Sequence, residues 1–229
     1  MKKLLILGLM LAGFNQAQAQ QDCKAYIPYE EGTLTEQTHY NKKGKITGKT
    51  IQTVRDIEQQ GNATLFRVEQ TSVDKEGENA MVTNMTFRCE DNVFYIDMNA
   101  FVNEEQMAAY EEMDIKVTMD AIDIPPNLTP GQQLEDGSIT MDIQSGAPIP
   151  IKFTIMVKNR QVGNRETLTT PAGTFDCIKI KQDVVTKSGF TITLQTVQWY
   201  TEGVGVVKSE SYRKDKLMGY SELTKLEKP

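Results

Sequence analysis

The stretch IKFTIMVK, residues 151–158, decides the fold class. Apolar and polar residues alternate along it with a period of two, which is typical of a β-strand with one face in the core and one in water. The apolar positions are Ile151, Phe153, Ile155 and Val157. Residues 190–199, FTITLQTVQW, repeat the pattern. Both stretches therefore predict antiparallel strands with one solvated face.

The same alternation continues through the N-terminal part of the chain. Turn-forming clusters that recur about every ten residues separate the alternating stretches. Examples are NKKGK (residues 41–45), KEGEN (residues 75–79) and EDN (residues 90–92). Such spacing is typical of a sandwich or barrel meander. We therefore predict an all-β fold, with a strongly curved antiparallel sheet or a barrel-like meander.

One segment departs from this alternation. In NEEQMAAYEEM, residues 103–113, Met107 and Tyr110 recur at helical spacing and glutamates occupy much of the remaining surface. We predict one short amphipathic helix near residues 103–113. Such a helix beside a curved β wall could cover an apolar cavity, and Met107, Tyr110 and Trp199 are the candidate ligand-binding residues. Ordinary core packing is the alternative explanation for the same three residues.

A proline-rich stretch divides the chain into two portions of similar size. Residues 125–136 contain three prolines and a glycine, which oppose regular structure. We interpret this stretch as a crossover between an N-terminal β-meander (residues 20–124) and a C-terminal β-meander (residues 137–229). A long crossover inside one curved sheet has the same sequence signature, so we expect one continuous structural unit.

Residues 1–19 have the features of a signal peptide. Two lysines precede an apolar run over residues 4–14, and Ala17-Gln18-Ala19 is the small-x-small pattern found before a cleavage site. We expect cleavage after Ala19 and export to the periplasm or the outer surface. The apolar run is shorter than the about 20 residues that a membrane-spanning helix needs, and no later segment reaches that length. The sequence thus predicts no transmembrane segment.

Three cysteines are expected to lie in an oxidising compartment. Cys23 follows Gln20-Gln21-Asp22 instead of a small-residue lipobox, so we expect that the protein is not a lipoprotein. Cys89 shares a strand parity with Met85, which directs it toward apolar surroundings. We predict a Cys23–Cys89 disulfide, worth roughly 4 kcal/mol in the loop-entropy model, and a spare Cys177. Three buried free thiols are the alternative.

The net charge of the chain is acidic. The formal charge is −6, and cleavage after Ala19 removes two lysines and no acid, which makes it −8. Nucleic-acid binding requires a basic face that neutralises phosphates. We therefore expect no nucleic-acid partner.

Residues 169–177, TTPAGTFDC, bring a hydroxyl, a carboxylate and a thiol close together in the sequence. Pro171 presets φ for a turn and Gly173 is favoured at the fourth turn position, so we interpret the stretch as a hairpin. A nucleophilic Cys177 would need a base, and the single histidine, His39, is far away in the sequence. The hairpin interpretation therefore explains the stretch better than a catalytic one.

The sequence contains no recognisable pattern for a metal or cofactor site. One histidine and three scattered cysteines have no metal-ligand spacing, so we predict neither a metal nor a cofactor. Acid pairs such as Glu104 and Glu105, or Asp120 and Asp123, would suit a glycosidase. Nothing in their spacing selects them.

Several longer phrases resemble a known family. They occupy residues 23–48 (CKAYIPYEEGTLTEQTHYNKKGKITG), 124–137 (IPPNLTPGQQLEDG), 167–180 (TLTTPAGTFDCIKI) and 199–223 (WYTEGVGVVKSESYRKDKLMGYSEL). They are similar to the TapB-like family of exported bacterial proteins, which is common in Bacteroidetes and related to the YmcC-like β-proteins. The resemblance implies a strongly curved antiparallel β fold in the cell envelope. It implies no activity and no catalytic residues.

These observations favour a non-enzymatic binding or accessory module of the cell envelope. Its partner would be an amphipathic ligand or another envelope protein. One alternative is a hydrolase that acts on envelope glycans or lipids through a carboxylate pair, which would require two acids facing each other across a cleft. The other alternative is a structural component of an outer-membrane assembly, which would expose a large apolar patch.

Overall fold

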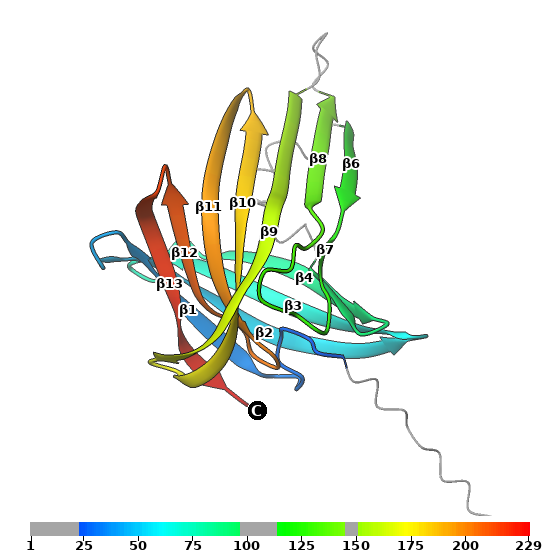
Figure 1. The fold of residues 1–229 in the computed structure, drawn as a ribbon, viewed down its shortest axis with the longest axis vertical. Helices are drawn as coiled ribbons and strands as arrows, with labels where there is room; N and C mark the ends of the chain where they lie inside the picture. Colours follow the sequence, from blue (N-terminus) through cyan, green and yellow to red (C-terminus); the bar gives the residue numbers. More distant parts are fainter. Residues whose placement is uncertain (1–22, 97–113, 145–150) are drawn as a thin grey trace, which may run out of the picture.

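Thirteen β-strands form one antiparallel sheet (Figure 1). The computed structural model describes residues 23–96, 114–144 and 151–229. The strands are β1 (Leu34–Asn41), β2 (Ile46–Gln60), β3 (Ala63–Asp74), β4 (Met81–Glu90), β5 (Val93–Ile96), β6 (Asp114–Asp120), β7 (Ile122–Ile124), β8 (Gly137–Gln144), β9 (Ile151–Thr170), β10 (Gly173–Ser188), β11 (Phe190–Thr201), β12 (Gly205–Arg213) and β13 (Lys216–Glu227). The all-β prediction is confirmed.

The helix expected near residues 103–113 lies outside the described residues. Within the described ranges the chain is strand, turn or irregular. That part of the chain contains no helix with the length and apolar character needed to cross a bilayer.

The alternation in the sequence reappears as alternating burial. On β9, Ile155 and Val157 are buried, whereas Lys152 and Lys158 are exposed. The start of the stretch 190–199 differs, because Phe190 is 69% exposed. Phe190 lies at the β10–β11 turn, and Figure 1 shows the tip of this hairpin at the upper end of the sheet, far from β1 to β4. The apolar face predicted for that strand is therefore buried only in part.

The strand order joins the two meanders in the middle of the sheet. The order is β6-β8-β9-β10-β11-β12-β13-β1-β2-β3-β4-β5-β7. The first and last strands, β1 and β13, pair with each other. β6 belongs to the N-terminal portion of the sequence but pairs with β8 of the C-terminal portion. The described parts of both portions therefore share one sheet.

The sheet curves until its two edges meet. β6 and β7 are the two edge strands, yet only Ala121 separates them in the sequence. The result is a nearly closed, barrel-shaped sheet, in which β6 and β8 to β11 stand as a wall above β1 to β4 (Figure 1). A Cβ atom on Gly137 would lie 2.6 Å from Ile122 Cγ1 and 3.1 Å from the Asp120 carbonyl oxygen. Only glycine allows this close approach at the closure.

The main core includes the segment that precedes β1. Residues 25–27 are buried and pack in one cluster with residues from both meanders. A disulfide joins Cys23 to Cys89 on β4, the pairing that strand parity favoured. Cys177 is a buried free cysteine. The disulfide thus holds the N-terminal segment against the inside of the sheet.

Residues 169–177 form the turn between β9 and β10. Thr170 pairs with Gly173, which leaves Pro171 and Ala172 as a two-residue turn. Gly173 has a φ of 141°, which L side chains rarely adopt. The backbone N–H of Ala172 donates to Thr170 Oγ1 at 3.3 Å. Pro171 and Gly173 therefore have positions that turn geometry explains.

Candidate ligand-binding site

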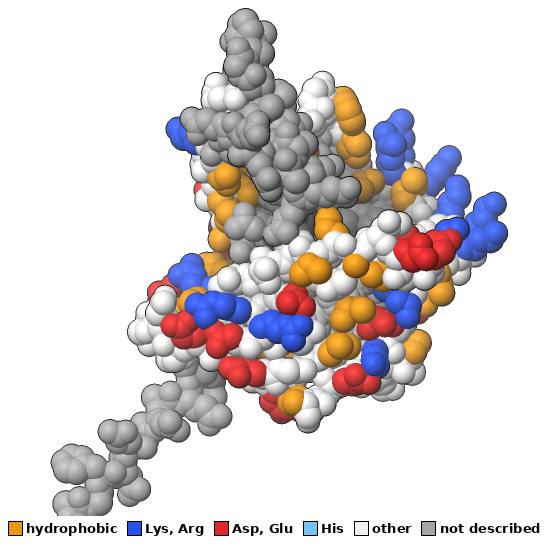
Figure 2. Space-filling model, turned by 180° about the vertical axis from the view of Figure 1, so that it is seen from behind, with side chains coloured by type: hydrophobic (Ala, Val, Ile, Leu, Met, Phe, Trp, Pro, Cys, Tyr) orange, Lys and Arg blue, Asp and Glu red, His pale blue; other side chains and the backbone are white. Residues whose placement is uncertain are grey.

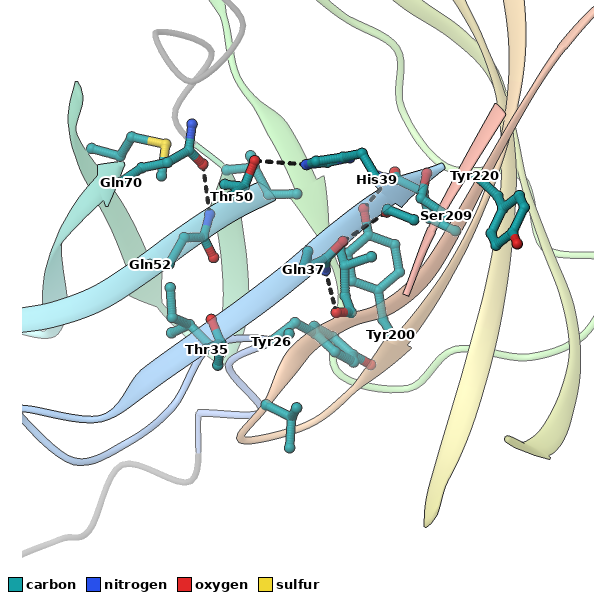
Figure 3. A pocket seen from close by; sticks show the side chains of 18 of the residues that line it. Tyr26, Thr35, Gln37, His39, Thr50, Gln52, Gln70, Tyr200, Ser209 and Tyr220 are labelled. Atoms are coloured by element: carbon teal, nitrogen blue, oxygen red, sulfur yellow. Dashed lines mark hydrogen bonds between the residues drawn. The ribbon is translucent and has the colours of Figure 1, made fainter. Parts of the chain in front are cut away.

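A cavity of about 520 Å³ lies inside the curved sheet. Its lining comes from β1 to β5, from β11 to β13 and from Tyr26 and Ile27 before β1. Because β13 pairs with β1, these two groups of strands form one continuous wall. Figure 3 shows lining side chains from both meanders around this space.

One part of the lining is apolar and aromatic. Phe87 and Phe94 stack with their ring centroids 5.7 Å apart. Tyr26 meets Phe94 edge-on at 6.1 Å and Tyr200 at 5.7 Å. The other apolar lining residues are Ile27, Met85, Ile96, Val204 and Val206. This part of the cavity is continuous with the main core, since all four rings belong to it.

The rest of the lining presents mainly amide and hydroxyl groups (Figure 3). They belong to Thr35, Gln37, Thr50, Gln52, Gln70, Gln198, Ser209, Ser211 and Ser221. Gln52 Nε2 donates to Gln70 Oε1 at 2.9 Å. Gln37 Nε2 donates to the Val206 carbonyl at 2.6 Å, and Gln37 Oε1 accepts from Ser221 Oγ at 2.7 Å. These bonds fix the orientation of the amides while leaving part of their hydrogen-bonding capacity free.

A second hydrogen-bond chain connects the cavity wall to the sheet behind it. Tyr200 Oη donates to Gln198 Oε1 at 2.8 Å, and Gln182 Nε2 donates to the same oxygen at 3.0 Å. Arg160 Nε in turn donates to Gln182 Oε1 at 3.4 Å. Burial raises the pKa of Tyr200 to about 12, so its hydroxyl stays protonated at neutral pH. The Tyr200 phenol is thus a fixed donor.

The lining is electrically neutral at pH 7. Among the described residues that line the cavity there is no Lys, Arg, Asp or Glu. His39 lines it, and its Nε2 lies 2.7 Å from Thr50 Oγ1. Burial lowers the pKa of His39 below its ordinary value, which favours the neutral ring. The cavity therefore offers hydrogen bonds without a formal charge.

Trp199 does not line this cavity, whereas its neighbour Tyr200 does. Adjacent strand residues point to opposite faces, and Trp199 packs in a separate cluster with Cys177. Trp199 Nε1 donates to Glu166 Oε1 at 2.5 Å. The ammonium groups of two lysines lie over the indole ring, at 5.8 and 5.3 Å from its centroid. Met107 and Tyr110, the other two candidates, lie outside the described residues.

Cys177, Asp120 and Asp123, which were weighed for catalysis, do not line the cavity. Cys177 is fully buried, and burial raises the pKa of its thiol, which disfavours the reactive thiolate. Asp123 lies 3.5 Å from Arg160, and Asp120 accepts a hydrogen bond from Ser138. Glu104 and Glu105 fall outside the described ranges. Within those ranges, no three His, Cys, Asp or Glu side chains are grouped to hold a metal ion.

The sequence contains a signal for the polar wall that our sequence interpretation did not use. On β3, Phe66, Val68 and Gln70 share one parity, and the first two are buried. On β2, Gln52 likewise shares one parity with buried Val54. A glutamine on the apolar parity of a strand points into the interior, where it needs a hydrogen-bond partner. Such glutamines indicate a polar interior surface.

Two solved structures share this fold. One, from Bacteroides fragilis, is a protein inferred to be exported with a YmcC-like fold; it has a TM-score of 0.71 and 24% sequence identity, over 88% of this chain and 98% of that one. The other, from Parabacteroides distasonis, is inferred to be a lipoprotein; it has a TM-score of 0.72 and 23% identity, over 90% of this chain and 100% of that one. No curated protein sequence matches this chain.

The family model with the description DUF3108-like matches residues 30–223. That range begins just before β1 and ends within β13, so it includes the cavity wall formed by β1 to β5 and β11 to β13. The expected relationship to exported YmcC-like β-proteins agrees with the description of the Bacteroides fragilis neighbour, and the Parabacteroides distasonis neighbour shares the fold. This chain therefore belongs to the DUF3108-like family.

Proposed function

We propose that the protein binds a neutral amphiphile in the cavity and acts in the cell envelope as a non-enzymatic binding or accessory module. One observation supports this proposal above all others: the cavity combines an aromatic, apolar part with a wall of uncharged amides and hydroxyls. An amphiphile has the same two-part character. Its apolar chain would pack against Phe87 and Phe94, and its head group would bond to the glutamines.

The dimensions of the cavity suit a small lipid or a lipid-like molecule. Its volume of about 520 Å³ lies within the range of about 300 to 1,000 Å³ that ligand pockets occupy. Each methylene group that leaves water for the apolar part would contribute about 0.8 kcal/mol. A charged head group would find no counter-ion on the described lining and would lose its hydration. The proposed head group is therefore neutral and rich in hydroxyl or amide groups.

Location in the envelope forms part of the proposal. The signal-peptide features of residues 1–19 and the exported or lipoprotein character inferred for the two neighbours support export to the periplasm or the outer surface. The disulfide suits an oxidising compartment. It also engages the sulfur of Cys23, which would otherwise be the nearest candidate for lipid attachment. We therefore propose cleavage after Ala19 without lipidation.

The hydrolase alternative receives no support from the site. A glycosidase needs two carboxyl groups about 5 to 9 Å apart across its substrate. No carboxylate is present among the described residues that line the cavity. A binding role requires only amide, hydroxyl and apolar side chains, and these line the cavity.

The proposal is tested by identifying what the protein carries. Protein purified from its native envelope is extracted with organic solvent, and the extract is analysed by mass spectrometry. We expect a stoichiometric neutral amphiphile. A protein that is empty, or that carries only anionic lipids, contradicts the proposal and would favour a protein partner, which cross-linking in intact cells would identify.

A cavity-filling variant links the ligand to this site. Ser209→Phe places a ring where a small side chain lines the cavity, and should reduce ligand occupancy at least tenfold, about 1.4 kcal/mol. Ser188→Phe makes the same change at the β10–β11 turn, outside the lining, and is the matched control. Equal occupancy in the two variants would place the ligand elsewhere.

A further inference from the structure

Two turns lie side by side at one end of the sheet. They are the β1–β2 turn, residues 42–45, and the β12–β13 turn, residues 214–215, taken with the flanking strand ends Arg213 and Lys216. β1 and β13 are paired, with Asn41 opposite Gly219. The backbone N–H of Lys42 donates to the carbonyl of Met218 at 3.2 Å. The charges of the two turns are therefore part of one surface, which we call the basic edge.

The basic edge carries six cations and one carboxylate, Asp215. The cations are Lys42, Lys43, Lys45, Arg213, Lys214 and Lys216, and all are exposed. None of the six forms an ion pair with an acidic side chain in the described part of the chain. Figure 2 shows Lys and Arg side chains gathered along one edge of the molecule. This concentration stands out in a chain of formal charge −6.

An apolar row accompanies these charges. Ile46 is directly opposite Tyr40 on the neighbouring strand, and Tyr40 is directly opposite Tyr220. Directly opposed residues share a face, and the two tyrosine rings stack with centroids 4.8 Å apart. Met218, two positions from Tyr220 on β13, lies beside this row at the end where its carbonyl accepts from the Lys42 N–H. The side chains at the ends of this row are open to solvent, since Ile46 is 46% and Met218 is 47% exposed.

Exposed apolar side chains flanked by unpaired cations match the chemistry of an anionic bilayer surface. Tyrosine and aliphatic side chains are favoured at the boundary between head groups and acyl chains, and lysines near it are attracted to anionic lipids. We propose that the basic edge docks the protein on a bilayer surface that contains anionic lipids. The neighbouring β3–β4 turn has three acids, Asp74, Glu76 and Glu78, against Lys75, so the docking surface ends there.

Docking in this way would bring the candidate binding site close to the bilayer. Tyr40 and Tyr220 belong to the apolar row and also line the cavity. The turn itself adjoins the cavity, because a Cβ atom on Gly44 would lie 3.6 Å from Tyr220 Oη. The docking proposal goes beyond the proposed function and does not depend on it, since the charges and the row are present whatever the cavity binds.

Vesicle sedimentation tests the proposal. The protein from residue 20 onward, which contains every described residue, is mixed with vesicles of phosphatidylcholine alone or of phosphatidylcholine with phosphatidylglycerol. We expect binding to the anionic vesicles that weakens as salt is added. The triple variant Lys42→Gln, Lys43→Gln, Lys45→Gln should bind about fivefold more weakly per lysine, on the order of 100-fold in all.

A matched control removes the same amount of charge elsewhere. Lys116, Lys158 and Lys181 are exposed and, among the described residues, have no ion-pair partner within 4.0 Å. Their triple replacement by Gln should leave anionic-vesicle binding within about twofold of the unchanged protein, because these lysines lie on β6, β9 and β10, outside the two turns that form the basic edge. An equal loss in both triple variants would show that net charge alone governs binding and would overturn the proposal.

Two further outcomes separate the bilayer from other partners. The variant Ile46→Ser with Met218→Ser should weaken anionic-vesicle binding about tenfold, because it removes the apolar contact. The docking proposal would be overturned if the unchanged protein bound a soluble polyanion such as heparin but did not bind anionic vesicles. Ser209→Phe should bind vesicles as the unchanged protein does, so loss of cavity binding and loss of docking are distinguishable.

Discussion

Arg160 on β9 holds Asp123 on β7: Arg160 Nη2 donates to the Asp123 carbonyl at 2.8 Å, and Arg160 Nη1 lies 3.5 Å from Asp123 Oδ1. Arg160 Nη1 also donates to the Glu135 carbonyl at 2.7 Å. β7 is one edge of the sheet and β9 is the third strand from the other edge. The Arg160 side chain is 1% exposed, and this interior contact therefore closes the curved sheet.

Replacement of Arg160 by Met should destabilise the protein by about 3 kcal/mol, because three acceptors lose a donor that is largely shielded from water. Urea unfolding measures the loss. Arg165→Met, an exposed position on the same strand, is the control and should change stability by less than about 0.5 kcal/mol. Equal effects from the two variants would contradict a role for Arg160 in closing the sheet.

His39 should make the protein less stable in mild acid. Its folded-state pKa is lowered by burial, whereas the unfolded chain titrates near 6.5. Below about pH 6.5 the unfolded state therefore binds more protons than the folded state, so stability falls as the pH drops toward the folded pKa. Well above pH 6.5 both states are neutral and His39 adds no pH dependence.

The variant His39→Gln isolates this effect. Urea unfolding at pH 7.5 and pH 5.5 should show a smaller loss of stability on acidification in the variant than in the unchanged protein. Carboxylates titrate at lower pH in both proteins, so their effects cancel in the comparison. In Glu36, for example, burial opposes ionisation, but hydrogen bonds from Lys49 and Thr224 lower the pKa below its ordinary value. Identical losses would show that His39 does not titrate differently in the two states.

The Cys23–Cys89 disulfide should be the product of oxidative folding. It closes a loop with a sequence separation of 66, for which the loop-entropy model gives about 4 kcal/mol. Non-reducing peptide mapping should recover this pair, and Cys89→Ser should lower stability accordingly. Cys177→Ser, which removes the free thiol, should leave the mapping unchanged. Recovery of a Cys89–Cys177 pair would be incompatible with the strand parity described above.

Replacement of Gly173 by Val should destabilise the β9–β10 turn by about 1 to 3 kcal/mol, because a β-branched residue would be strained at a φ of 141°. The control is Ala172→Val, which places the same valine side chain at the neighbouring turn residue. Thermal unfolding of the two variants measures the difference in stability. Unchanged stability in Gly173→Val would count against this turn geometry.

The sequence alone determined the features that depend on short-range pattern. Alternation in residues 151–158 and the spaced turn clusters predicted the antiparallel β fold, because side-chain direction in a strand depends only on residue parity. Parity also placed Cys89 on an interior face. The expectations for residues 1–19 likewise depend on local composition and remain predictions.

The tertiary structure decided what depends on contacts between distant strands. Trp199 and Tyr200 are adjacent aromatic residues on one strand, and both are 7% exposed, so burial does not show which one faces the cavity. Gln37, Gln52 and Gln70 become one wall only because β1, β2 and β3 pair in a particular register. The pairing of β13 with β1 and the contact of Arg160 with Asp123 join residues far apart in the chain. Local periodicity assigns a face to each strand, but closure of the whole sheet determines which faces meet and what they enclose.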